Sequence, residues 1–256
     1  MQAVNQLTAA PPAPIPGIAE DLARQLTGIN KIDPIEDPGR YDLRLNGGDW
    51  PTDDPEALTM IGMQRMRNIY ALTADLLSRR VPGNFMECGV WRGGAAIYMR
   101  KLLNLYGGGQ ADRYVILADS FEGLPPMEAR THSADHLDFG SNSVLAVSLW
   151  EVMKNFSSTP GPVKWLPGWL KDTLPDFGNR GLAPLALLRI DCDLYESTMC
   201  CLENLYQYVS PGGYVIVDDY ALSPCRMAVE EFRSTVSLND SPLIKIDWTG
   251  VYWRKP

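Results

Sequence analysis

Apolar, strand-like segments alternate with helix-like segments along most of this 256-residue chain, and that alternation restricts the fold more than any other feature. The four clearest strand-like runs are NFMECGV (84–90), RYVILADS (113–120), LALLRIDCD (185–193) and GGYVIVDDY (212–220). Continuous apolar runs are typical of strands that are buried on both faces, and helices between them provide the crossovers that parallel strands need. The pattern predicts an α/β protein with a mostly parallel sheet between helical layers.

Helical periodicity and shorter apolar runs complete this arrangement. Helices are expected at 55–79, 93–106, 143–156, 195–208 and 225–235, and short strands at 163–166, 243–246 and 250–254. The last two strands should form an antiparallel hairpin at one edge of the sheet. Between the second strand and the next helix, residues 121–142 form a polar loop that is long enough to suggest a function.

The first 54 residues are different, because they are rich in Pro, Gly and Asp. We expect an irregular arm or lid with one short helix near 18–26; a partly disordered tail is the alternative. Residues 55–256 should form the main domain.

Composition excludes several classes of protein. The formal net charge of −8 disfavours a nucleic-acid partner, since an acidic surface repels phosphates. No apolar run is long enough to span a membrane, and the N-terminus lacks the pattern of a signal peptide. The odd number of cysteines suits reduced thiols in the cytoplasm; they are Cys88, Cys192, Cys200, Cys201 and Cys225.

Ligands of open α/β sheets bind beyond the carboxyl ends of the strands, so the residues there are the first candidates for a site. The first strand runs into Glu87-Cys88-Gly89-Val90-Trp91-Arg92-Gly93-Gly94, in which glycines permit a sharp turn close to a ligand. The spacing is not that of a dinucleotide-binding loop, and a purely structural turn is the alternative. The second strand ends in Asp119, whose carboxylate could accept hydrogen bonds from a ribose or simply cap a turn.

Two further strands end in acidic pairs, Asp191-Cys192-Asp193 and Asp218-Asp219-Tyr220. Carboxylates that converge at one edge of a sheet repel one another unless something neutralises them, and a hard cation does so. Zinc is disfavoured, because the chain has only two histidines, His132 and His136, and no cysteine pair at zinc spacing. The alternative is that these carboxylates are solvated caps.

Softer signals lie in three other segments. The indole of Trp169 could stack on an adenine ring or pack in the core, and Met60 and Ile61 could cover a cofactor or belong to the core. His132 and His136 fall in the long polar loop, where a surface role is favoured over contact with a substrate.

Together these segments resemble the macrocin O-methyltransferase family, whose members methylate sugar hydroxyls of macrolide and aminocoumarin antibiotics. The resemblance covers most of residues 55–256. It is carried by TMIGMQRMRN (59–68), VPGNFMECGVWRGGA (81–95), LADSFEGLPP (117–126), WLPGWLKDTLP (165–175), LLRIDCDLYESTM (187–199), VSPGGYVIVDDY (209–220) and GVYWRK (250–255).

The resemblance implies a class I fold, with a Rossmann-like sheet of seven strands whose last strand is antiparallel. It implies Mg²⁺ held by Asp191, Asp218 and Asp219, with Asp193 outside the ligand set. The residues that it implies for S-adenosylmethionine are Met60, Ile61, Glu87, Gly89, Val90, Trp91, Arg92, Gly93, Asp119, Ser120, Phe121, Gly168, Trp169 and Asp191. One departure is Cys192, at a position where the family pattern leads us to expect Gly.

The expected reaction is an in-line transfer of a methyl group to a hydroxyl that the metal activates, with Asp191 as the catalytic base. The acceptor should be a small glycosylated molecule, and a phenolic catechol is the strongest alternative. A dehydrogenase would not need Asp218 and Asp219, an N-methyltransferase would carry an Asn/Asp-Pro-Pro-Tyr tetrad, and a non-catalytic scaffold would be expected to lose the carboxylates. A homodimer is possible through Ile15, Ile18, Tyr41 and Trp50 in the first 54 residues.

Overall fold

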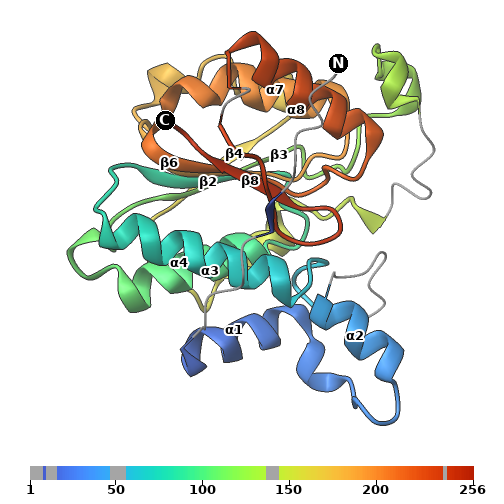
Figure 1. Cartoon of the computed structure of the whole chain (residues 1–256), viewed down its shortest axis with the longest axis vertical. Helices are drawn as coiled ribbons and strands as arrows, with labels where there is room; N and C mark the ends of the chain where they lie inside the picture. Colours follow the sequence, from blue (N-terminus) through green and yellow to red (C-terminus); the bar gives the residue numbers. More distant parts are fainter. Residues whose placement is uncertain (1–7, 10–15, 47–55, 137–143, 239–240) are drawn as a thin grey trace.

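The computed structural model describes residues 8–9, 16–46, 56–136, 144–238 and 241–256, and it centres on one sheet (Figure 1). The strand order is β1-β7-β8-β6-β5-β2-β3-β4. The strands are β1 (Thr8–Ala9), β2 (Asn84–Cys88), β3 (Val115–Asp119), β4 (Val163–Pro167), β5 (Leu185–Ile190), β6 (Val209–Val217), β7 (Ile244–Lys245) and β8 (Val251–Arg254). Only β8 pairs antiparallel among these described strands, lying between β6 and β7. The predicted mostly parallel sheet with an antiparallel last strand is therefore confirmed, and the two-residue β1 extends its edge beyond β7.

Helices cover both faces of the sheet, as Figure 1 shows. One layer contains α3 (Met63–Ser78) and α4 (Gly94–Tyr106), and the other contains α7 (Tyr195–Leu205) and α8 (Ser223–Thr235). Helix α1 (Gly17–Thr27) packs on α3 and α4, on their side away from the sheet. The shorter helices are α2 (Pro38–Asn46), α5 (Leu149–Phe156) and α6 (Leu170–Thr173). Helix α2 contacts α3. Each layer packs its apolar face against the sheet, so the strands are buried from both sides, as their continuous apolar sequences predict.

Two predicted helices begin later than expected. The helix predicted from residue 55 begins at Met63, because the segment before it is held in a loop. There the N–H of Leu58 donates to the carbonyl of Leu26 (2.9 Å), and the N–H of Gly94 donates to the carbonyl of Leu58 (2.8 Å). The helix predicted from residue 143 begins at Leu149, where Ser148 caps it; residue 143 itself lies outside the described residues.

The segment before residue 55 contains more structure than predicted. The short helix expected near 18–26 is confirmed as α1, whose Ala19 and Ala23 are fully buried. The hydroxyl of Tyr98 on α4 donates to the carbonyl of Ala19 (3.1 Å), so α1 is tied to the helical layer. Helix α2 was not predicted. The domain division at residue 54 and a lid role for this segment stay predictions, and Ile15 and Trp50 lie outside the described residues.

Two observations bear on the expectations from composition. Among the described helices, none is long and apolar enough to cross a membrane. The five cysteines are free thiols, and all but Cys200 are buried.

Candidate functional site

The carboxyl ends of β2, β3, β5 and β6 lie side by side, and the turns that follow β2 and β5 touch at Gly89. The N–H of Asp191 donates to the carbonyl of Cys88 (2.8 Å), which brings the turn after β5 against the turn after β2. Gly89 has φ +81°, and a Cβ at this position would overlap the carbonyl group of Asp191. Only glycine allows this approach, so the first predicted loop is required for the two strand ends to meet.

Asp119, at the end of β3, is held by backbone N–H groups. Its Oδ2 accepts from the N–H of Val90 (2.6 Å) and its Oδ1 from the N–H of Phe121 (2.7 Å). Burial raises the pKa of Asp119, although these hydrogen bonds oppose the shift. The carboxylate is thereby fixed against the turn that follows β2.

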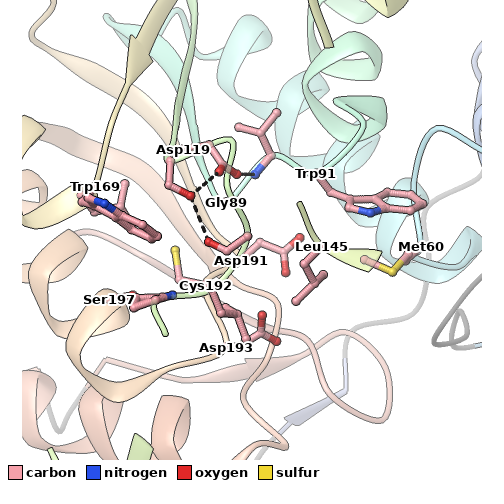
Figure 2. A pocket seen from close by; sticks show the side chains of 16 residues that line it. Met60, Gly89, Trp91, Asp119, Leu145, Trp169, Asp191, Cys192, Asp193 and Ser197 are labelled. Carbon is pink, nitrogen blue, oxygen red and sulfur yellow. Dashed lines mark hydrogen bonds between the residues drawn. The ribbon is translucent and has the colours of Figure 1, made fainter. Parts of the chain in front are cut away.

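A first cavity, of about 100 Å³, opens beside Asp119 (Figure 2). The residues predicted to bind the cofactor that line this cavity are Met60, Gly89, Val90, Trp91, Asp119, Ser120, Trp169 and Asp191. Figure 2 shows Trp169 on one side of Asp119 and Asp191, with Met60 and Trp91 on the other. Cys192, Leu145 and Ser197 also line this cavity, although the sequence did not mark them as cofactor-binding.

Four of the predicted cofactor residues line neither this cavity nor the second one described below. Arg92 lays its guanidinium over the ring of Trp91 (4.3 Å) and donates to the carbonyl of Ala57 (2.9 Å). Phe121 is almost fully buried, and the N–H of Gly168 donates to the carbonyl of Asp119 (2.9 Å).

Gly93 is the fourth of them. It has φ +88° at the start of α4, where a side chain would press on Val152. Of the four, Arg92, Phe121 and Gly168 contact residues that line the first cavity, namely Trp91 and Asp119.

A second cavity, of about 400 Å³, adjoins the first. Ile61 and Glu87, also predicted from sequence, line it, together with Asp218 and Asp219. The residues shared by the two cavities are Met60, Val90, Trp91, Leu145, Asp191 and Asp193. Asp191 therefore lies where the cavities meet.

The three predicted metal ligands come together in this second cavity. Asp191, Asp218 and Asp219 each offer a carboxylate oxygen, and these oxygens lie within 4.8 Å of one another. Asp218 is buried, whereas Asp191 and Asp219 are partly exposed. Oxygen atoms grouped in this way can bind a hard divalent cation.

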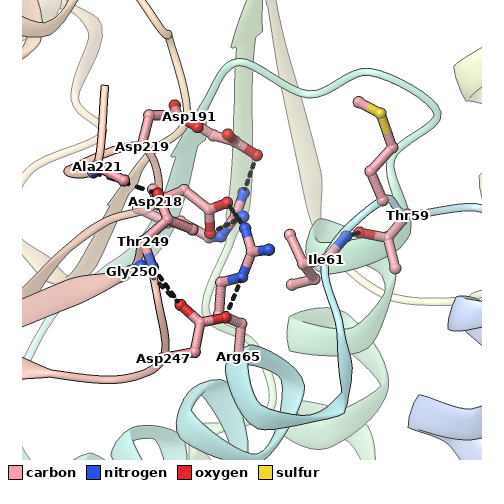
Figure 3. A network of polar contacts seen from close by, with 12 residues as sticks. Thr59, Ile61, Arg65, Asp191, Asp218, Asp219, Ala221, Asp247, Thr249 and Gly250 are labelled. Atoms are coloured by element: carbon pink, nitrogen blue, oxygen red, sulfur yellow. Dashed lines mark hydrogen bonds and ion pairs between the residues drawn. The ribbon is translucent and has the colours of Figure 1, made fainter. Parts of the chain in front are cut away.

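Two arginines, which the sequence analysis missed, also neutralise this cluster. Arg189 is 1% exposed; its Nη1 contacts Glu87 (2.5 Å) and Asp191 (2.8 Å), and its Nη2 contacts Asp218 (2.5 Å). Arg65, from α3, pairs with the other oxygen of Asp218. Figure 3 shows Arg65 between Asp218 and Asp247, to which its Nε donates (2.9 Å). These two guanidinium groups therefore supply part of the neutralisation that the sequence analysis assigned to a hard cation.

Carboxylates nevertheless outnumber guanidinium groups here. Arg65 and Arg189 form ion pairs with Glu87, Asp191, Asp218 and Asp247. Two more acidic side chains, Asp193 and Asp219, line the same cavity, so six carboxyl groups accompany two guanidinium groups. Burial, followed by the charge of Asp191, raises the pKa of Asp193 to about 7. Burial and the neighbouring Asp193 raise the pKa of Asp219 well above its usual value.

Among the three predicted metal ligands, Asp218 is the one whose pKa is lowered. Burial opposes its ionisation, but Arg189 and Arg65 together hold its pKa below the usual value. The two guanidinium groups thus keep Asp218 ionised, whereas burial and mutual repulsion favour the protonated form of Asp193 and Asp219.

Glu87 has a separate feature. Its pKa is raised to about 8, chiefly by burial, although Arg189 opposes the shift. One of its oxygens, Oε2, is buried and has no hydrogen-bond partner among the described residues. A buried, unsatisfied acceptor beside a cavity suits a ligand that carries a donor.

The two predicted histidines lie outside both cavities. The ring of His132 stacks on Tyr195 (3.8 Å), and His136 pairs with a backbone carbonyl. Between them, the fully buried Asp135 accepts from the N–H groups of Tyr195 (2.6 Å) and Glu196 (3.0 Å) at the start of α7. The described part of the predicted polar loop is therefore tied to the helix that follows the Asp191 turn.

The chain is similar to proteins of known activity over nearly all of its length. A sequence model of the macrocin O-methyltransferase family matches residues 21–255. The chain is 45% identical over 218 residues to the 8-demethyl-8-(2,3-dimethoxy-α-L-rhamnosyl)-tetracenomycin C 4′-O-methyltransferase of Streptomyces olivaceus, covering 83% of this chain and 80% of that one. It is 46% identical over 222 residues to the demethyldecarbamoylnovobiocin O-methyltransferase of Streptomyces niveus, covering 84% and 81%.

A solved structure, that of the O-methyltransferase NovP, is similar in fold as well as in sequence. It superposes with a TM-score of 0.82 at 42% identity, and the match covers 93% of this chain and 98% of that one.

Proposed function

The chain belongs to the macrocin O-methyltransferase family and is an O-methyltransferase, and from that premise we propose its donor, its metal and its acceptor. The donor is S-adenosylmethionine, the metal is Mg²⁺ bound by Asp191, Asp218 and Asp219, and the acceptor is a sugar hydroxyl of a glycosylated natural product. The observation that carries this proposal is the meeting of two cavities at Asp191, one beside Asp119 and one containing the carboxylate cluster.

The first cavity fits an adenosine-containing donor. Asp119 is fixed by backbone N–H groups at the position where a carboxylate accepts hydrogen bonds from ribose hydroxyls, and Trp169 offers a ring for adenine. The unsatisfied Oε2 of Glu87, which lines the adjoining second cavity, suits the ammonium group at the other end of the donor. When bound, S-adenosylmethionine supplies an electrophilic methyl group, whose transfer to an oxygen leaves a neutral thioether.

The carboxylate cluster fits a hard divalent cation. Its ligand oxygens are close together, and the excess of acidic groups over guanidinium groups favours added positive charge. Bound there, Mg²⁺ would lower the pKa of an acceptor hydroxyl and orient it.

Asp191 is the best candidate for the catalytic base. It lies at the junction of the cavities, its side chain is 30% exposed, and Arg189 fixes its Oδ2 at 2.8 Å. We propose that Asp191 takes the hydroxyl proton as the new carbon–oxygen bond forms. Arg189 would position this carboxylate without touching the acceptor.

The relatives support the class of acceptor. Their names describe methylation of a rhamnosyl-bearing tetracenomycin and of demethyldecarbamoylnovobiocin. We extend this class, a glycosylated natural product, to the present chain.

The proposal is tested by measuring methyl transfer from S-adenosylmethionine to demethyldecarbamoylnovobiocin, to p-nitrophenyl α-L-rhamnoside and to catechol, after chelation and again with added Mg²⁺. We expect Mg²⁺-dependent transfer to at least one glycoside. Asp219→Asn should abolish the response to Mg²⁺, whereas Asp112→Asn, on an exposed carboxylate, should not. Transfer only to catechol would overturn the acceptor class, and full activity after chelation would overturn the metal.

Two further properties stay proposals. The free thiols support a cytoplasmic location. Of the residues predicted for a homodimer contact, Ile18 on α1 is described and is 62% exposed, which leaves it available for a second subunit.

A further inference from the structure

An exposed tryptophan, Trp248, lies at the wall of the second cavity. Its side chain is 62% exposed, yet it lines the same cavity as Asp218 and Asp219. Trp150 is also exposed, at 72%, but it lines neither cavity. Single exposed apolar residues are common on proteins, so exposure alone does not indicate a function.

The two neighbours of Trp248 are buried and firmly held. Asp247 accepts from the N–H groups of Thr249 (3.0 Å) and Gly250 (2.7 Å), and its other oxygen accepts from Arg65 (2.9 Å). The hydroxyl of Thr249 donates to the carbonyl of Asp218 (3.0 Å). Figure 3 shows this turn joined to the carboxylate cluster through Arg65 and Asp218.

This anchoring fixes the backbone on both sides of the indole. The same arginine holds the turn through Asp247 and the cluster through Asp218, so Trp248 has a defined position relative to the proposed metal ligands. An aromatic side chain on a rigid base provides a large contact area and loses little conformational entropy on binding.

The rest of the cavity has two chemical characters. One part consists of carboxylates and guanidinium groups, and the other is apolar; the apolar lining residues that are not among the predicted cofactor residues are Leu58, Ala95, Leu145 and Leu222. A ligand that fits this cavity combines a polar, hydroxyl-bearing end with an apolar body.

We propose that Trp248 binds the acceptor by packing against the apolar aglycone that adjoins the methylated sugar. This inference rests on the proposed function, which puts the reacting hydroxyl at Asp191. With the sugar at the carboxylates, the part of the acceptor that extends toward solvent meets the exposed indole. Trp248 thereby selects glycosides with an apolar or aromatic aglycone over the sugar alone.

The test compares two acceptors that share a sugar but differ in the aglycone, p-nitrophenyl α-L-rhamnoside and methyl α-L-rhamnoside. Trp248→Ala should raise KM for the p-nitrophenyl glycoside about 10- to 100-fold, as expected when the burial of a large aromatic contact is lost. KM for the methyl glycoside should change by less than about 2-fold, because it has little aglycone to lose contact with. Trp248→Phe, which keeps an aromatic ring, should retain most of the preference.

Two controls separate this effect from misfolding and from loss of the donor. Trp150→Ala removes a comparably exposed indole outside the cavities and should leave both KM values unchanged. The Kd for S-adenosylmethionine, measured by calorimetry, should be the same in Trp248→Ala and the unmodified protein.

An unchanged ratio of the two KM values in Trp248→Ala would overturn the inference while leaving the proposed function intact. An equal rise for both glycosides would also overturn it, because Trp248 would then contact the sugar. If the unmodified protein methylates neither these rhamnosides nor demethyldecarbamoylnovobiocin, the proposed function fails, and this inference fails with it.

Discussion

The two cavities that meet at Asp191 are built in different ways. Around the first, backbone groups do most of the positioning: N–H groups hold Asp119, and Gly89 lets two strand ends touch. Around the second, charged side chains from distant segments hold one another. Arg65 pairs with Asp218, 153 residues away, and with Asp247, 182 residues away.

This difference determines what each region tolerates. A wall made by backbone depends on the few positions where a side chain cannot fit, so most substitutions around it should be mild. A buried charge network depends on every partner, because removing one leaves another charge without compensation. Substitutions in the two regions should therefore differ in how much they destabilise the protein and in which positions are sensitive.

The largest expected effect on stability comes from breaking the ion-pair network around the second cavity. Arg189→Met removes the guanidinium that contacts Glu87, Asp191 and Asp218, and it should lower the free energy of unfolding by about 3–5 kcal/mol. Urea denaturation measures this change. Arg226→Met, at an exposed arginine of α8, is the matched control and should change stability by less than about 0.5 kcal/mol. Equal stability of the two variants would contradict the importance of the network.

The next effect probes the backbone-built region. Gly89→Ala places a Cβ against the carbonyl group of Asp191 at a positive φ, and it should cost at least about 2 kcal/mol, since both overlap and backbone strain contribute. Gly39→Ala, where a Cβ meets nothing within 4 Å, should be neutral or slightly stabilising, because Ala favours the helix α2. Thermal unfolding of both variants checks this, and a stable Gly89→Ala protein would mean that the strand ends can separate.

A third substitution should separate stability from activity. Asp219→Asn replaces a carboxyl group whose pKa is raised by burial and by the neighbouring carboxylates, so its ionised form is unfavourable without a metal. The metal-free variant should be as stable as the unmodified protein or more so, by up to about 1 kcal/mol, while methyl transfer falls at least about 100-fold. Loss of stability together with activity would indicate that Asp219 has a structural role instead.

The smallest effect is a dependence on pH. The folded-state pKa of Asp193 is about 7, above the ordinary aspartate value of 3.8, so the folded protein binds this proton more tightly than the unfolded chain does. The resulting stability is fully present below pH 3.8 and is lost as the pH rises through about 7.

Thermal unfolding of metal-free protein should therefore show a Tm that falls between about pH 5.5 and about pH 8. Asp193→Asn should flatten this dependence. Added Mg²⁺ should raise Tm more at the higher pH than at the lower one, since the metal binds deprotonated carboxylates. A Tm that rises with pH in metal-free protein would contradict the electrostatic account of the cluster.

Much of the backbone-built region could be predicted from local sequence. Continuous apolar runs identify strands buried on both faces, and the residues that follow them must lie at one edge of a parallel sheet. For that reason Asp119, Asp191, Asp218 and Asp219 can be grouped from the order of the strands along the chain. Gly89 stands out because only a residue without a side chain permits the turn that it makes.

The ion pairs around the second cavity and the position of the Trp248 indole could not be predicted from the sequence, because both depend on tertiary structure. Arg189 sits within an apolar strand, where a buried charge does signal a partner, but the sequence does not say which one. Arg65 looks like any arginine on a helix, and its role follows from contacts across more than 150 residues. Trp248 looks like any aromatic residue near a turn, and its place at the wall of the second cavity is visible only in the folded structure.

The physical reason is that the two kinds of information differ in range. The periodicity of strands and helices and the conformational needs of glycine act over a few residues, so they can be read along the chain. Charge compensation depends on which side chains share a buried volume, and only the folded arrangement of α3, β5, β6 and the β7–β8 turn brings Arg65, Arg189, Asp218 and Asp247 together.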